Sequence, residues 1–389
     1  MVIVRAPVRI SFGGGGTDLA AYYTHFNGFV VSSAITRYCY VMAKATADGS
    51  TRISSADYHM WQSYPRGVMP PVAAPLFLPK AAIAWFMERD LLTEGVDLFL
   101  ASEVPPGTGL GSSSSMAVAL VYALAALAGS SMEPGEAAEL ACELEIERLV
   151  MPIGKQDQYA SAMGGLNTIE FTANAVHVSP LALAPEVSAA LSARLMLFST
   201  GQARNSAEIL DKQRADTEKK VKTVEALHRI KALAIAMQKA LVAGDLDHFG
   251  HLLDLGWQEK KQLSRKISSA AIDACYEAAR RAGAIGGKIV GAGGGGFLLL
   301  YCPQPRQKAV RAALTHCGLR EMTFDLDFTG AQVLMSLPDE HLRSSVPIHS
   351  NLAEERMQLF AAKGDHSAAR INHVGTRFIA SEEGKYNVR

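Results

Sequence analysis

The sequence has few cysteines and no excess of either charge. Its five cysteines are scattered without a CxxC pair, which indicates reduced thiols and excludes a disulfide framework or a cysteine-rich zinc site. The 38 basic and 38 acidic side chains cancel, whereas nucleic-acid-binding proteins usually carry a basic surplus. We therefore expect a cytoplasmic protein with no nucleic-acid partner.

Long apolar runs are also absent from the sequence. The longest, residues 116–128, is too short to span a bilayer and predicts a buried helix instead. The first residues lead into Ala6-Pro7 without a sustained apolar region, so we expect no signal peptide and no membrane partner. The 389 residues suffice for two ordinary domains with a large core.

Glycine is abundant and gathers in short runs. The first run to consider is Pro-Pro-Gly-Thr-Gly-Leu-Gly-Ser-Ser-Ser-Ser at 105–115, between a predicted strand at 96–100 and an apolar helix that starts near Met116. Glycines let the backbone approach a ligand closely, and the unpaired N–H groups at a helix start favour anions. The run predicts the phosphate cradle of a nucleotide-using enzyme; a flexible linker is the plainer alternative.

Two common nucleotide-binding motifs are excluded. The run at 105–115 lacks the lysine of the Walker A motif. The run Gly291–Gly296 matches GxGxxG, but the dinucleotide fingerprint needs a helix after it, and residues 297–301 predict a strand. A third run, Gly13–Gly16, precedes Thr17 and Asp18 and requires close approach or unusual dihedral angles.

Hydrophobic patterning predicts an α+β protein with strands first. In the first hundred residues we expect strands at 2–5 and 8–12, broken by Pro7, further strands at 29–35 and 38–43, an irregular segment at 51–75 and a helix at 80–89. Helices to about 149, a new segment from 155 and a hairpin at 167–178 follow. The second half predicts strands at 194–199, 285–290, 297–301 and 322–328, a very long helix from about 205 to 243, and helices at 246–255, 268–281 and 307–317. Beyond about 337 the sequence turns polar, with a possible helix at 352–362.

Four charged residues are candidates for chemistry. Glu147 and Asp157 suit phosphoryl transfer, in which one carboxylate holds Mg²⁺ and another positions the attacking hydroxyl; alternatively, they are a solvated helix residue and a helix cap. Arg9 lies in an apolar strand, where a buried cation requires a partner. Asp18 is either an ordinary turn residue or a ligand for a polyol.

The order of these motifs resembles the kinase superfamily of galactokinase, homoserine kinase, mevalonate kinase and phosphomevalonate kinase (GHMP kinases). Three segments carry the resemblance: Ala6-Pro7-Val8-Arg9 through Asp18, Pro105–Ser113, and Lys288–Phe297. It implies a two-domain α+β fold. Residues 1–185 would form a domain like ribosomal protein S5 domain 2, residues 186–336 a ferredoxin-like domain, and 337–389 an extension of unknown role.

Three strings narrow the resemblance. Gly-Gly-Gly-Thr-Asp at 14–18, Gly-Lys-Gln-Asp-Gln-Tyr-Ala at 154–160 and the segment 199–210 are similar to the D-glycero-D-manno-heptose 7-phosphate kinases. This implies phosphorylation of the anomeric hydroxyl to a 1,7-bisphosphate, for nucleotide-activated heptose synthesis. Fucokinases share the Thr-Asp after glycines, so a kinase of an unphosphorylated hexose such as fucose or galactose stays open, as do a non-catalytic sensor of sugar and ATP and a homodimer.

The resemblance also implies roles for single residues. Asp157 would be the catalytic base, assisted by Arg9, while Ser113 and Glu147 would hold Mg²⁺. The ATP, in a pocket for a syn adenine, would contact Pro105, Gly107, Thr108, Gly109, Leu110, Gly111, Ser112, Ser113 and Ser114. The sugar would contact Gly15, Gly16, Thr17, Asp18, Gly293, Gly294 and Gly295. Candidates for a distal sugar phosphate are Arg204, Lys155 and Arg37, since arginine suits bidentate phosphate contacts.

Overall fold

The computed structural model describes residues 1–201 and 206–337, which belong to one compact unit. Its larger sheet has strands in the order β12-β1-β2-β5-β3-β4, and β2 also pairs with β6, which pairs with β7. The bounds are β1 Val2–Gly13, β2 Gly28–Ala45, β3 Thr51–Ser55, β4 Met60–Tyr64, β5 Val96–Ser102, β6 Leu166–Phe171, β7 Val176–Pro180 and β12 Gln332–Ser336.

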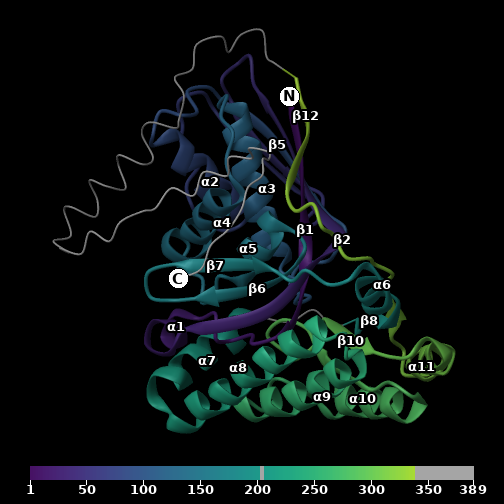
Figure 1. The fold of residues 1–389 in the computed structure, drawn as a ribbon. Coiled ribbons are helices and arrows are strands. Elements are labelled where there is room, and N and C mark those ends of the chain that lie inside the picture. Colours follow the sequence, from purple (N-terminus) through teal and green to yellow (C-terminus); the bar gives the residue numbers. More distant parts are fainter. Residues whose placement is uncertain (202–205, 338–389) are drawn as a thin grey trace, which may run out of the picture. The chain divides into compact units, whose positions relative to one another are not determined.

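Helices from the first half of the chain cover one face of this sheet (Figure 1). They are α2 Phe77–Met87, α3 Ser112–Leu127, α4 Pro134–Cys142, the π-helix η1 Glu143–Arg148 and α5 Gln156–Met163. The helix α1, Ala20–Phe26, lies apart from them and contacts α7, Ser206–Lys219. The helix α3 packs on β1 and β2 and is buried over most of its length, because its sequence is apolar on all sides. This packing places the first turn of α3 close to the middle of β1.

A smaller sheet, ordered β11-β8-β10-β9, belongs to the second half. Its strands are β8 Leu195–Ser199, β9 Gly286–Ile289, β10 Phe297–Tyr301 and β11 Arg320–Glu321. The accompanying helices are α6 Pro185–Arg194, α7 Ser206–Lys219, α8 Val221–Val242, α9 Leu246–Leu263, α10 Ala270–Ala282 and α11 Gln304–His316. Figure 1 shows α8, α9 and α10 side by side below the long strand β1.

The two halves share one hydrophobic core. Phe12 of β1 meets Phe249 of α9 edge to face, with ring centroids 5.4 Å apart, and Phe249 meets Tyr301 of β10 at 6.0 Å. Aromatic pairs in this geometry stabilise more than their buried area alone. The end of β1 is therefore held between the two sheets.

The two-sheet α+β architecture confirms the expected fold class, but four local predictions are wrong. Pro7 does not break β1; the strand continues with a register shift between Pro7 and Val8. The segment 51–75 contains the hairpin β3–β4 instead of being irregular. The long helix is interrupted at Lys220. Residues 322–328 form no strand, only an isolated bridge between Ile35 and Leu326.

The strand β12 returns to the first sheet. It pairs antiparallel with β1, with Val2 opposite Ser336 and Arg5 opposite Gln332. The last strand before residue 337 thus completes the N-terminal sheet rather than the C-terminal one. The boundary near 185 between two domains stays a prediction, and the possible helix at 352–362 lies outside the described residues.

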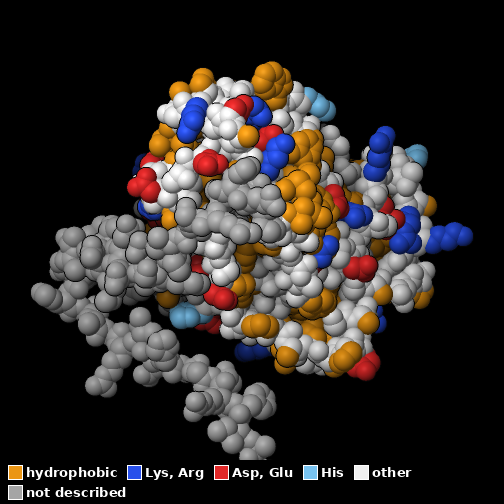
Figure 2. All heavy atoms as spheres, turned by 90° about the horizontal axis from the view of Figure 1, so that it is seen from above, with side chains coloured by type: hydrophobic (Ala, Val, Ile, Leu, Met, Phe, Trp, Pro, Cys, Tyr) orange, Lys and Arg blue, Asp and Glu red, His pale blue; other side chains and the backbone are white. Residues whose placement is uncertain are grey.

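Two properties of the structure can be compared with the composition: the distribution of charged side chains and the length of apolar helices. On the face shown in Figure 2, lysine and arginine side chains alternate with acidic ones, so neither sign gathers into a patch there. Within residues 1–201 and 206–337, no helix combines the length and the apolar character needed to cross a membrane.

Candidate active site

A cavity of about 600 Å³ lies where the two halves of the described unit meet. Its polar wall is formed by Arg9 and Asp18 from the N-terminal segment, the turn at 107–114, and Asp157. Gln213, Lys260 and Gly291 come from the second half. An apolar end is lined by Tyr58, Leu76, Phe77, Leu78, Pro79 and Leu100. A mostly apolar cavity with a few converging polar groups is the usual form of a small-molecule site.

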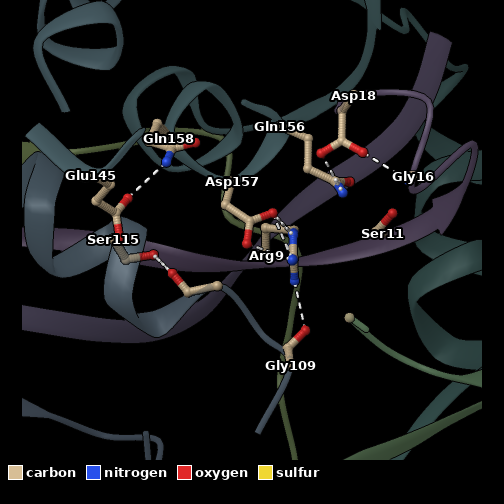
Figure 3. A network of polar contacts seen from close by, with 12 residues as sticks. Arg9, Ser11, Gly16, Asp18, Gly109, Ser115, Glu145, Gln156, Asp157 and Gln158 are labelled. Carbon is tan, nitrogen blue, oxygen red and sulfur yellow. Dashed lines mark hydrogen bonds and ion pairs between the residues drawn. The ribbon is translucent and has the colours of Figure 1, made fainter. Parts of the chain in front are cut away.

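Arg9 and Asp157 form a bidentate ion pair at the centre of the polar wall (Figure 3). Nε and Nη2 of Arg9 each donate to one Asp157 carboxylate oxygen at 2.7 Å, and Nη1 donates to the carbonyl of Gly109 at 2.8 Å. Arg9 is buried in β1, and Asp157 lies in the first turn of α5. The arginine thus fixes both the carboxylate and the glycine-rich turn, which confirms that this buried cation has a partner.

The glycine-rich turn packs directly against Asp157. Gly107, Gly109 and Gly111 have positive φ angles, and a Cβ on Gly111 would lie 3.0 Å from Asp157 Oδ2. Gly111 is also the N-cap of α3, so the N–H groups of the helix's first turn lie in the cavity wall with Ser112, Ser113 and Ser114. A helix N-terminus, which favours phosphate, therefore lies beside a fixed carboxylate.

Asp18 lies on the same wall, deeply buried. Its Oδ1 accepts a hydrogen bond from the Gly16 N–H at 2.7 Å, and its Oδ2 accepts one from Gln156 Nε2 at 3.1 Å. Burial raises the pKa of Asp18 above its usual range, and the negative charge of Asp157 adds to the rise. Figure 3 shows Asp18 and Gln156 beside the Arg9–Asp157 pair, so both carboxylates face one region.

The acidic side chain that meets Ser113 is Glu145, not Glu147. Ser113 Oγ donates to Glu145 Oε1 at 2.7 Å, and Gln158 Nε2 donates to Oε2 at 2.7 Å. Glu147 is exposed and does not line the cavity. The cause is local: residues 143–148 form a π-helix, which changes the face that each side chain presents, whereas the sequence predicts an ordinary helix there.

Burial raises the pKa of Glu145 to about 7, against hydrogen bonds from Ser113, Ser114 and Gln158 that lower it. The side chain is completely buried, and these hydrogen-bond donors are neutral. A carboxylate in such a place is poorly stabilised in its charged form. A cation beside it would restore the ordinary acidity.

The other predicted residues lie around the cavity in different ways. Gly15 and Gly16 line it, whereas Pro105, Thr108, Leu110 and Thr17 do not. The two threonines shape their loops instead: Thr108 Oγ1 donates to the Pro105 carbonyl at 2.7 Å, and Thr17 Oγ1 donates to the Gly14 carbonyl at 2.8 Å.

The glycine run 291–296 approaches the run at 105–115 without bringing all its residues to the cavity. Gly291 and Ala292 line the cavity, but residues 293–295 (Gly293, Gly294 and Gly295) do not. A Cβ on Gly296 would lie 2.1 Å from the carbonyl oxygen of Thr108, so the two loops touch where only glycine fits. The loop thus closes one side of the cavity.

Of the three basic candidates for a distal phosphate, the two that the structure describes, Lys155 and Arg37, do not line the cavity. Lys155 is next to Asp18 through its backbone, but its Nζ donates to Glu139 at 3.4 Å. Arg37 binds the carbonyl of Thr323 and faces Glu103. Arg204 lies outside the described residues.

Sequence reasoning missed several cavity residues. Ser11, Glu145, Gln156, Gln213 and Lys260 all line the cavity and are buried. Ser11 lies within the family motif at 6–18, and Gln156 lies within the string at 154–160. Their position in these motifs could have identified them as site residues. Gln213 and Lys260 lie on helices α7 and α9 far along the chain, and only the fold brings them here.

Family models match both halves of the chain. The model for the GHMP kinases N terminal domain matches residues 78–165, and the model for GHMP kinases C terminal matches residues 237–318. The first match contains the glycine-rich turn, Glu145 and Asp157, so it covers much of the cavity's polar wall.

Two curated proteins show the range of relatives. D-glycero-alpha-D-manno-heptose 7-phosphate kinase of Campylobacter jejuni is 31% identical over 331 residues, which are 84% of this chain and 96% of that protein. L-fucokinase/L-fucose-1-P guanylyltransferase of Bacteroides fragilis is 26% identical over 344 residues, covering 79% of this chain but 35% of that protein.

A solved structure supports the fold. The crystal structure of a D-glycero-D-manno-heptose 1-phosphate kinase from Bacteriodes thetaiotaomicron superposes with a TM-score of 0.73 at 28% identity. The match covers 87% of this chain and all of that one. Both sheets of the described unit are therefore found together in a known kinase structure.

Proposed function

Because the chain belongs to the GHMP kinases, we propose that it transfers the γ-phosphate of ATP to the anomeric hydroxyl of D-glycero-D-manno-heptose 7-phosphate, giving the 1,7-bisphosphate. The observation that carries the proposal is the Arg9–Asp157 pair, fixed against a glycine-rich turn and a helix N-terminus in one cavity. The name of the Campylobacter jejuni relative supports the sugar.

In this proposal Asp157 orients the sugar's C1 hydroxyl and accepts its proton as the oxygen attacks the γ-phosphorus. The new O–P bond forms while the bond to the β-phosphate oxygen breaks, and ADP leaves with that electron pair. Arg9 holds the carboxylate in place through two charge-assisted hydrogen bonds. Such positioning is the main contribution a protein makes to phosphoryl transfer.

Ser113 and Glu145 are the residues that would hold Mg²⁺. Their oxygens suit this ion, and Glu145 is a buried carboxylate that accepts hydrogen bonds from the neutral Ser113 and Gln158. Among the described residues no group of three or more His, Cys, Asp or Glu side chains could hold a metal alone, which fits an ion bound partly by nucleotide phosphates. When bound, Mg²⁺ neutralises phosphate charge during transfer.

Hydroxyl groups of the sugar have suitable partners beside the Arg9–Asp157 pair. Asp18 accepts hydrogen bonds, and Ser11 Oγ, Gln156 Oε1 and Gln213 Nε2 are buried without a protein partner in the described chain. Together these groups offer both hydrogen-bond donors and acceptors, which can pair with the hydroxyl groups of a sugar. The apolar end near Phe77 and Leu100 would take the adenine.

The test is a panel of sugars assayed with ATP and Mg²⁺. We expect turnover of heptose 7-phosphate, with a product whose new phosphorus resonance couples to the anomeric proton. Heptose 1-phosphate, free heptose, fucose and galactose form the other arms. Turnover of fucose or galactose without turnover of heptose 7-phosphate would overturn the proposed substrate while keeping the kinase; no ATP-dependent product with any sugar would overturn both.

A further inference from the structure

Lys288 is a buried lysine that the mechanism above does not use. It lies on β9, where it is opposite Leu299 of β10, and its side chain is 5% exposed. Its Nζ donates to the backbone carbonyls of Ser11 at 2.8 Å and Phe12 at 3.1 Å. The lysine therefore joins the smaller sheet to β1 of the larger one.

The two carbonyls lie at an irregular point of β1. The register of β1 on β2 shifts between Ser11 and Gly13, since Ser11 is opposite Ser32 and Gly13 is opposite Val31. Such a bulge leaves a residue out of the ladder and bends the strand. Buried carbonyls at a bulge need another donor, and Lys288 supplies it.

Both sides of this bulge lead to the cavity. Two residues before Ser11 is Arg9, which holds Asp157. After Phe12 the chain enters the glycine run, whose Gly16 N–H donates to Asp18. The bulge thus fixes the spacing between the residue that positions the catalytic carboxylate and the loop that lines the sugar side.

We propose that Lys288 is a positioning residue, which sets the relative place of Arg9 and the Gly13–Asp18 loop by binding the carbonyls of the β1 bulge. It does not touch the substrate. A backbone error of about 1 Å at such a point costs up to about 100-fold in rate, because the reacting groups are then misplaced. The inference rests on the proposed sugar-kinase function.

The test compares Lys288→Met with Lys288→Arg in the full chain. Methionine keeps most of the volume and removes the donors, whereas arginine keeps the charge and the donors. We expect K288M to raise the sugar KM and to lower kcat, each by about tenfold, while the Kd of a non-hydrolysable ATP analogue changes by less than about twofold. On a logarithmic scale, K288R should regain at least half of the kcat/KM that K288M loses relative to wild type.

Lys231 provides a matched control. Its Nζ also donates to two consecutive backbone carbonyls, those of Phe26 and Asn27, each at 3.0 Å, but away from the cavity. K231M should leave sugar KM and kcat within about twofold of wild type. Equal kinetic losses in K231M and K288M would reduce Lys288 to a general structural role and overturn the proposal.

Amide hydrogen exchange gives a readout that needs no substrate. In K288M, peptides covering residues 9–18 should exchange about tenfold faster. Unchanged exchange at 9–18, or unchanged kinetics, would overturn the positioning role even if the kinase acts as proposed. Absence of turnover by the wild type would instead overturn the proposed function, and the exchange result would still decide the role of Lys288.

If K288M does not fold, K288R carries both measurements: a normal sugar KM and normal exchange support the proposal, and a loss of both overturns it.

Discussion

The buried charges of this molecule fall into two kinds. Arg9 and Asp157 neutralise each other through a bidentate pair. Glu145 and Lys288 are buried like Arg9 and more deeply than the half-buried Asp157, but within the described chain their hydrogen-bond partners are hydroxyls, an amide and backbone carbonyls. Burial raises the pKa of Glu145 to about 7 and lowers the pKa of Lys288 to about 7.

The difference shows what each kind is built to do. A pair that is complete in the protein alone is a fixed part of the scaffold. A buried charge with only neutral partners is destabilising unless something compensates it. For Glu145 we propose that a metal ion compensates the charge. For Lys288 we propose that the gain is functional, because the lysine fixes the bulge of β1. The following experiments test this contrast, beginning with the largest expected effect.

Asp157→Asn should break the pair and the chemistry together. The amide keeps the shape but neither accepts the proton nor attracts Arg9 as strongly. We expect kcat to fall by about 10³-fold, with sugar and nucleotide Kd values within a few fold of wild type. Steady-state kinetics with calorimetric binding checks this; a D157N enzyme with near-normal kcat would remove Asp157 from catalysis.

Glu145→Gln and Glu147→Gln separate the two glutamates near η1. The first should raise the Mg²⁺ concentration required for half-maximal rate by about 10–100-fold, because a charged ligand is lost from a buried place. The second, an exposed residue, should have no measurable effect. The check is a Mg²⁺ titration at saturating ATP and sugar, and the reverse outcome would restore Glu147 as the metal ligand.

Arg9→Lys keeps the charge of the pair but not its geometry. An ammonium group cannot make two parallel bonds to Asp157 and a third to the Gly109 carbonyl. We expect kcat to fall by about tenfold, less than in D157N. If kcat in R9K equals that of wild type, charge alone is sufficient and the bidentate geometry is unimportant.

The smallest expected effect concerns stability and pH. The pKa of Lys288 is about 7 in the folded protein, against 10.5 for an ordinary lysine. Between pH 10 and pH 7 the unfolded chain therefore gains a proton that the folded protein does not bind, so wild type loses stability relative to K288M as pH falls. The difference in Tm should shift by at least about 2 °C over this window and change little below pH 7. A constant difference would contradict the lowered pKa.

Structural features that depend on residues close together in the sequence could be predicted from it. The strand–glycine–helix order at 96–127 and the strand after Gly296 were both predicted, because apolar patterning and glycine runs are local signals. Arg9 could be singled out for a similar reason, since an arginine within an apolar strand needs a partner. These signals were enough to predict residues that the structure brings to one cavity.

The features that could not be predicted depend on contacts between residues that are far apart in the sequence, or on local helix geometry. The π-helix that turns Glu145 toward Ser113 differs from an α-helix by one residue in a turn. Gln213 and Lys260 come to the cavity only through the packing of α7 and α9. The hairpin β3–β4 forms in a segment rich in turn signals, because pairing with β5 outweighs local preference.

The return of β12 to β1 has a consequence for how the protein is made. The N-terminal amine of Met1 donates to the carbonyl of Leu337, and β12 covers the edge of β1. A ribosome releases β1 first and β12 more than three hundred residues later. Throughout that interval the first strand keeps an open edge, which other chains could pair with. The nascent protein is thus exposed to mispairing until β12 emerges, and a chain truncated before Gln332 should aggregate even though every cavity residue is present.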